Sequence, residues 1–162
     1  MGLTADLVAL VAAAAGADPA AARRLSTELG DAAGDDPADL ARVLACSAFV
    51  SYLDLQFSEA LIIAERSLAL AEASGDTEAR LYALAMRLIV SAGIPAAIGS
   101  ELPDYFAAAW QMRDSLSALD VESKMLAGHF LAEGALATGR ISEAQAMLEL
   151  LGDIRAQRSA RE

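Results

Sequence analysis

Several residue types that build catalytic and metal sites are scarce in this chain of 162 residues. It has one cysteine, Cys46, and one histidine, His129. This excludes an intrachain disulfide, a zinc site made of cysteines and a metal site with two histidine ligands. The chain also lacks a phosphate-binding P-loop, a dinucleotide-binding glycine motif and a hydrolase nucleophile elbow. We therefore expect no metal, no cofactor and no enzymatic activity.

Positive charge and long hydrophobic runs are also in short supply. Twelve Lys and Arg residues face 23 Asp and Glu, so the net charge of −11 argues against direct binding of nucleic acid. The longest run without charge, Leu88–Ser100, is shorter than the ~18 residues of a membrane span. The apolar N-terminal stretch has Asp6 where a signal peptide carries basic residues, so it predicts a first helix. We expect a cytoplasmic protein that does not bind membranes.

Strand-forming residues are few. Val, Ile and Thr together number 17, against 39 Ala and 24 Leu, and this balance favours an all-α fold. Pro19 and Pro37 follow Asp18 and Asp36, a pattern typical of helix starts. Apolar residues at three- and four-residue spacing between glycines and prolines predict a single domain over 1–162. Its eight helices are expected at 3–15, 19–31, 37–54, 57–74, 76–92, 102–119, 121–138 and 141–157.

Two segments of the chain resemble each other. Residues within Leu55–Leu68 and Thr138–Leu151 align without gaps when Phe57 is set against Ile141, which places a Ser-Glu-Ala triplet in both. The offset is 84 residues, or two periods of 42. A helical hairpin cannot bury its apolar stripe alone, so repeated hairpins stack. The alternative is an alanine-rich helical bundle in which short matches arise by chance.

The motif GRISEAQAML and the segment LQFSEALIIAERSLALAEASGD resemble tetratricopeptide-like repeats of the longer kind. The resemblance covers 37–157 well and 3–31 loosely, with a period of 42 where ~34 is usual. It implies a right-handed stack of about four antiparallel hairpins. Such domains accompany helix-turn-helix transcription activators with an ATPase module, or diguanylate cyclases. The resemblance therefore implies a protein-interaction or signal-input module of a bacterial regulatory protein.

In that family the first helix of each hairpin lines a concave groove. Carried onto this chain, the resemblance predicts a groove with Arg42, Phe49 and Tyr52 from one hairpin. His129 and Glu133 would come from the last hairpin, and the 42-residue period adds Arg87. A groove mixing arginine, aromatic residues and histidine would hold an acidic or amphipathic peptide, so the expected partner is a protein or peptide.

His129 also carries the alternative interpretation. Glu133 lies four residues later on the same helical face and would tune the imidazole, so a small-ligand or enzymatic pocket near His129 stays open. Cys46 is expected to be a small buried hydrophobe. The aspartates at 31, 35 and 36 are interpreted as capping and solvated turn charge.

The ends of the chain are unusually apolar for a stack of repeats, whose ends need polar caps. Together with the apolar joint at 93–103, they predict a homodimer or docking against another domain of the same protein. The last predicted helix runs into the basic stretch RAQRSARE without a Gly or Pro stop. We expect the chain to be part of a longer regulatory polypeptide, with a free-standing adaptor as the alternative.

Overall fold

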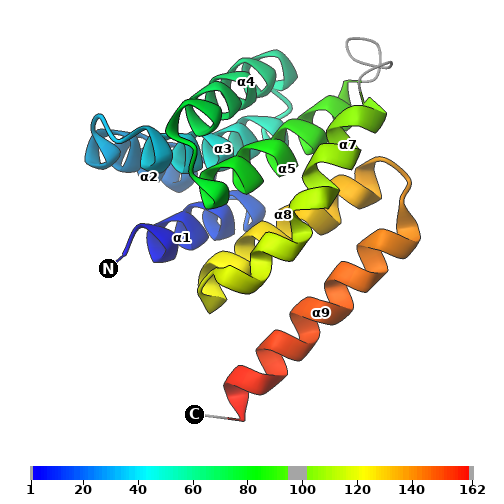
Figure 1. The fold of residues 1–162 in the computed structure, drawn as a ribbon. Coiled ribbons are helices and arrows are strands. Elements are labelled where there is room, and N and C mark those ends of the chain that lie inside the picture. Colours follow the sequence, from blue (N-terminus) through cyan, green and yellow to red (C-terminus); the bar gives the residue numbers. More distant parts are fainter. Residues whose placement is uncertain (1, 95–101, 161–162) are drawn as a thin grey trace.

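The computed structural model describes residues 2–94 and 102–160, which form eight α-helices and one 3-10 helix packed against one another (Figure 1). No strand occurs in these ranges. The elements are α1 (Leu3–Ala15), α2 (Pro19–Ala33), α3 (Pro37–Leu53), α4 (Phe57–Ser74), α5 (Thr77–Gly93), α7 (Leu102–Gln111), η1 (Met112–Ala118), α8 (Val121–Ala137) and α9 (Ile141–Ser159). The all-α prediction is confirmed. Most of the apolar joint predicted at 93–103 lies outside the described residues.

Helix starts follow the aspartates. The side chains of Asp18, Asp36, Asp76 and Asp120 each accept hydrogen bonds from backbone N–H groups of the first turn that follows. These bonds satisfy donors that have no partner inside the helix. Every expected helix start agrees with the structure to about one residue, including those of α1 and α4, which have no side-chain cap.

One predicted helix is split. The expected helix at 102–119 changes from α to 3-10 geometry at Met112. The segment after that point is rich in short polar side chains, and the hydroxyl of Ser117 donates to the carbonyl of Asp114 at 2.8 Å. Such local bonds compete with the regular α-helical pattern and favour tighter turns.

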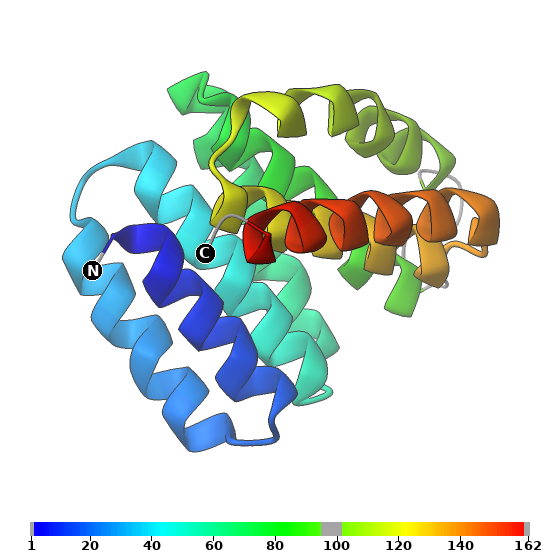
Figure 2. The same ribbon diagram turned by 90° about the horizontal axis from the view of Figure 1, so that it is seen from below.

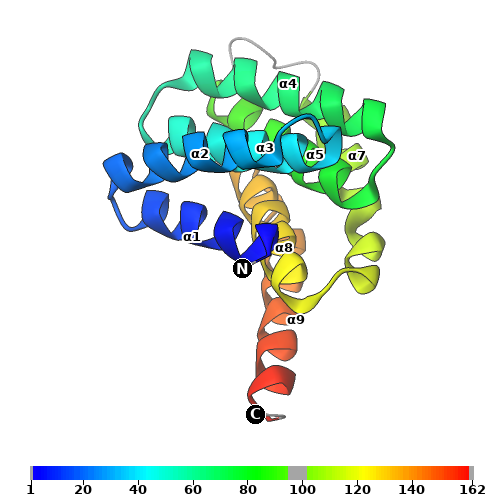
Figure 3. The same ribbon diagram turned by 90° about the vertical axis from the view of Figure 1, so that its left-hand side faces the viewer.

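Neighbouring helices pack in a regular order. α1 packs on α3, α3 packs on α5, and α5 packs on α8. α2 lies beside α1 and α3, α4 lies beside α3 and α5, and α9 lies beside α8. Figure 2 shows α1 and α2 running antiparallel, and Figure 3 shows α9 running away from the other helices. The first helix α1 also contacts α8 near the other end of the chain. An open stack, in which each repeat touches only its neighbours, lacks such a contact.

The same turn closes three of the hairpins. Ala17, Leu55 and Gly139 each follow the end of a helix and have a left-handed backbone, with φ of 59°, 61° and 75°. In each turn the next N–H reaches back to a carbonyl five residues earlier: Asp18 to Ala13 at 3.0 Å, Gln56 to Ser51 at 2.9 Å and Arg140 to Ala135 at 2.8 Å. The two segments aligned in the sequence therefore share their turn geometry, and the first hairpin has it as well.

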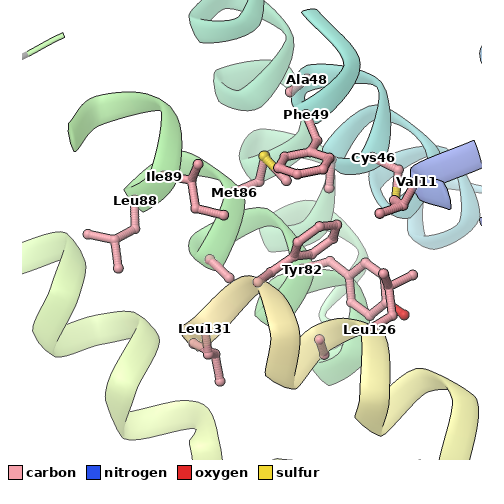
Figure 4. Close-up of a cluster of buried hydrophobic side chains, with 14 of the residues drawn as sticks. Val11, Cys46, Ala48, Phe49, Tyr82, Met86, Leu88, Ile89, Leu126 and Leu131 are labelled. Atoms are coloured by element: carbon pink, nitrogen blue, oxygen red, sulfur yellow. The ribbon is translucent and has the colours of Figure 1, made fainter. Parts of the chain in front are cut away.

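The main core lies between α1, α3, α5 and α8, whose side chains meet in one cluster (Figure 4). The ring of Phe130 contacts Phe49 at 5.5 Å and Tyr82 at 6.0 Å between centroids. Small residues let the helices approach closely. A Cβ at Gly134 would lie 2.7 Å from the end of the Leu88 side chain, so α8 can rest on α5 here because Gly134 has no side chain.

Candidate functional site

An open cleft of about 860 Å3 lies at the C-terminal ends of α1, α3 and α8. Ile89, in the C-terminal part of α5, also lines it. Its lining residues are Ala14, Ala15, Ala17, Pro19, Phe49, Tyr52, Leu53, Asp54, Ile89, His129, Glu133, Leu136 and Ala137. Most of these side chains are apolar, with a few polar groups among them, which is the usual make-up of a ligand site.

Four of the six residues predicted for the groove lie in this cleft. Phe49 and Tyr52 come from the last two turns of α3, and His129 and Glu133 from the second half of α8. Phe49 is buried against Phe130, while the Tyr52 ring meets the edge of Phe57 at 5.7 Å. The structure therefore brings together residues separated by eighty positions in the sequence, as the repeat register predicted.

His129 and Glu133 present their polar ends to solvent. Their side chains are 47% and 45% exposed, and His129 Nε2 lies 3.9 Å from Glu133 Oε1. That separation is longer than a hydrogen bond, so the carboxylate of Glu133 forms none with a described residue. Both groups are available to a ligand that enters the cleft.

Arg42 lies outside the cleft. It belongs to the second turn of α3, about two turns before Phe49, where its guanidinium pairs with Asp39 and with Glu78 at 3.2 Å. Burial alone would lower the pKa of Arg42, but the hydrogen bond that Arg42 donates to Asp39 and the charge of Glu78 outweigh it and raise the pKa above its ordinary value. Arg42 thus joins α3 to α5.

Arg87 also lies outside the cleft and is almost fully buried, at 4% exposure. It bonds Ser91 on its own helix, pairs with Glu65 of α4 at 3.2 Å and lies 4.7 Å from the ring centre of Tyr105 on α7. The expectation of Arg87 in an accessible groove is corrected by these contacts. α5 begins at Thr77, 40 positions after α3 begins at Pro37. The two-residue difference from a 42-residue period turns a helical side chain by about 200°.

Ile89 is the counterpart of Phe49 on α5. It lies 40 positions after Phe49 and lines the same cleft. The sequence interpretation missed Ile89, Leu53, Asp54, Ala137 and the lining residues between Ala14 and Pro19. No copy of the Ser-Glu-Ala motif occurs in α5, so that motif could not set the register of this helix.

The electrostatic character of the cleft is negative. Glu133 and Asp54 line it, and no described lysine or arginine does. α1, α3 and α8 end at the cleft, and the last turns of these helices contain no basic residue. Each helix C-terminus contributes about half a negative charge. Asp54 is paired with Arg23 of α2 at 2.5 Å, which neutralises part of this charge at one side.

A second polar group of residues lies at the N-terminal ends of the same helices. The Nε of Arg42, Oε1 of Glu78 and the hydroxyl of Tyr82 are buried and form no hydrogen bond within the described part. Burial raises the pKa of the Tyr82 phenol, as do Cys46 and Glu78, while the nearby Ser123 hydroxyl acts in the opposite direction. Glu78 and Tyr82 lie four positions apart on α5, but nothing in the sequence signals that they meet Arg42 of α3 and Ser123 of α8.

Cys46 is fully buried beside this polar group. Burial raises the pKa of its thiol far above the ordinary value, with a small opposing effect of Arg42. The thiolate is therefore strongly disfavoured, and Cys46 packs in the core as a small apolar side chain. The prediction of a buried Cys46 is confirmed.

Within the described ranges, no three His, Cys, Asp or Glu side chains gather closely enough to hold a metal ion. None of the helices in these ranges combines the length and apolar composition that a membrane crossing needs. No family model, curated protein or solved structure matches this chain.

Proposed function

We propose that this chain is a non-catalytic binding module that holds a peptide or a partner segment in the cleft at the ends of α1, α3, α5 and α8. The observation that carries the proposal is the convergence of Phe49, Tyr52, His129 and Glu133 on one open cleft. Its apolar walls and few exposed polar groups suit a bound segment with an apolar face.

A tetratricopeptide-like stack of four hairpins is our proposal for the architecture. Three hairpins share one turn geometry, and α1, α3, α5 and α8 pack in succession as the first helices of such a stack would. The contact of α1 with α8 then means that the stack is strongly curved, which gives the concave side the shape of a cleft rather than a long groove. A role as signal input in a regulatory protein, and a homodimer or docked domain, stay predictions from the sequence.

The test is to fill the cleft without disturbing the fold. Ala137 is exposed at the end of α8 and lines the cleft, so Ala137→Trp would block it. Ala146 is exposed on α9 outside the cleft, and Ala146→Trp is the matched control. Both variants should melt cooperatively and within a few degrees of the parent protein.

A random peptide library displayed on phage, panned against the parent protein, supplies the ligands. We expect enriched peptides to bind the parent and Ala146→Trp alike and to lose about tenfold or more in affinity with Ala137→Trp. If no peptide is enriched, or if Ala137→Trp binds as the parent does, the cleft is not a peptide site. Enhanced hydrolysis or another reaction of a ligand that depends on His129 would favour the enzymatic alternative instead.

A further inference from the structure

The charges that line the cleft are one-sided. Glu133 is a half-exposed carboxylate with no hydrogen bond to another described residue, and Nε2 of the His129 imidazole lies 3.9 Å from its Oε1. Asp54 is held by Arg23. The two arginines that the sequence placed in the groove are bound elsewhere, Arg42 by Asp39 and Glu78 and Arg87 by Glu65. An anionic ligand would therefore meet carboxylates with no lysine or arginine from the described lining.

The backbone adds to this negative potential. α1, α3 and α8 have their C-terminal ends at the cleft, so the negative end of each helix dipole lies there. Proteins commonly offset this charge with Lys, Arg or His in the last helical turn. Here the last turns of all three helices lack a basic residue. A cation supplied by a ligand would make the missing interaction.

The apolar part of the cleft suits the rest of such a ligand. Phe49 and Ile89 form a buried wall of the cleft. Tyr52 and Leu136, which is 43% exposed, lie nearer its opening. The aliphatic stem of Lys or Arg packs on surfaces of this kind while its charged end stays at a polar rim. The aromatic ring of Tyr52 can also attract a cation.

We propose that the occupant of the cleft is a basic amphipathic peptide segment, which places a Lys or Arg side chain at Glu133 and the helix ends and its apolar residues on Phe49, Tyr52 and Leu136. This rests on the proposed binding function and specifies the chemistry of its ligand. It replaces the acidic peptide that the sequence suggested, because that expectation depended on Arg42 and Arg87.

The charge can be tested with peptides that differ in one respect. The probe is a short acetylated peptide with leucines at helical spacing and lysines between them, and two versions replace every lysine by glutamine or by glutamate. Binding is measured by fluorescence anisotropy at about 0.05 M and about 0.5 M salt. We expect the lysine peptide to bind most tightly, the glutamate peptide least, and the preference to shrink at high salt.

A pair of variants locates the interaction. Glu133→Gln keeps the shape of the side chain and removes its charge, whereas Glu122→Gln makes the same change in an exposed residue at the far end of α8. We expect Glu133→Gln to weaken the lysine peptide about tenfold and to leave the glutamine peptide nearly unchanged. Glu122→Gln should leave both affinities unchanged. Equal effects of the two variants would overturn a specific role of Glu133.

The outcomes separate this inference from the broader proposal. If the glutamate peptide binds as tightly as the lysine peptide, and Ala137→Trp still blocks it, the binding function stands and the cationic specificity is refuted. If no peptide binds, or Ala137→Trp blocks none, the binding function itself fails. Butylguanidinium, tested alone, distinguishes the source of the cation. If it binds with the same dependence on Glu133 while the peptides do not, a small organic cation replaces the peptide and the inference is refuted in that part.

Discussion

Leu55 offers a sharp test of the repeated turn. It is the left-handed residue that links α3 to α4, with φ of 61°, and its side chain is 71% exposed. The corresponding residue between α8 and α9 is Gly139, with φ of 75°. Hydrogen bonds on both sides hold the conformation of Leu55, from its own N–H to Tyr52 at 3.0 Å and from Gln56 to Ser51 at 2.9 Å. A side chain that contributes little burial is thus kept in a backbone conformation that favours glycine.

We expect Leu55→Gly to raise the free energy of unfolding. A left-handed conformation costs a residue with a side chain about 1–2 kcal/mol. Glycine loses more backbone freedom on folding than leucine does, and this offsets about 0.5–1 kcal/mol of the stabilisation. The net gain is about 0.5–1 kcal/mol, which corresponds to a rise in Tm of about 1–4 °C for a domain of this size.

Ile62 supplies the matched control. It is 67% exposed within α4, so Ile62→Gly removes a similar apolar side chain from a position with helical backbone. There glycine has no conformational advantage, and the free energy of unfolding should fall by about 0.5–1 kcal/mol. Urea denaturation followed by far-UV circular dichroism measures both variants. If Leu55→Gly is destabilised as much as Ile62→Gly, the turn does not hold Leu55 in the left-handed region.

Two further predictions concern polar groups. At the start of α8, the carboxylate of Asp120 accepts hydrogen bonds from the backbone N–H groups of Glu122 and Ser123 and from the Ser123 hydroxyl. These bonds lower the pKa of Asp120, and the bond from the backbone of Ser123 is the largest cause. Asp120→Ala should cost about 1 kcal/mol at neutral pH. Because the folded-state pKa lies below the unfolded value, the contribution is complete above the ordinary pKa of about 3.9 and is lost as the pH falls through the folded-state pKa. Denaturation at a series of pH values should show the variant and parent converging in acid, and a constant difference would contradict this. Tyr82→Phe removes a buried hydroxyl that has no hydrogen bond in the described part, so it should leave stability unchanged or raise it by up to about 1 kcal/mol. A loss of 1 kcal/mol or more in the same assay would mean that the hydroxyl is bonded.

The starts of the helices could be predicted from the sequence because they depend on neighbours within one turn. Asp18, Asp36 and Asp120 accept backbone N–H groups two or three residues ahead, and Pro19 and Pro37 fit the first helical position. The alignment of the second and last hairpins had the same local basis. The resemblance put Phe49, Tyr52, His129 and Glu133 in one groove, and in the structure these four residues line one cleft.

The position of Arg87 could not be obtained in that way. Which face of α5 meets the cleft depends on the offset between α3 and α5, and a change of two residues moves a side chain by about 200°. The contact between α1 and α8 likewise depends on the sum of the packing angles from α1 to α3, from α3 to α5 and from α5 to α8. The sequence alone determined the all-α class and the starts of the helices. Only the tertiary structure decided which charges line it, because burial and ion pairing with Glu65, Asp39 and Glu78 remove both arginines from the cleft.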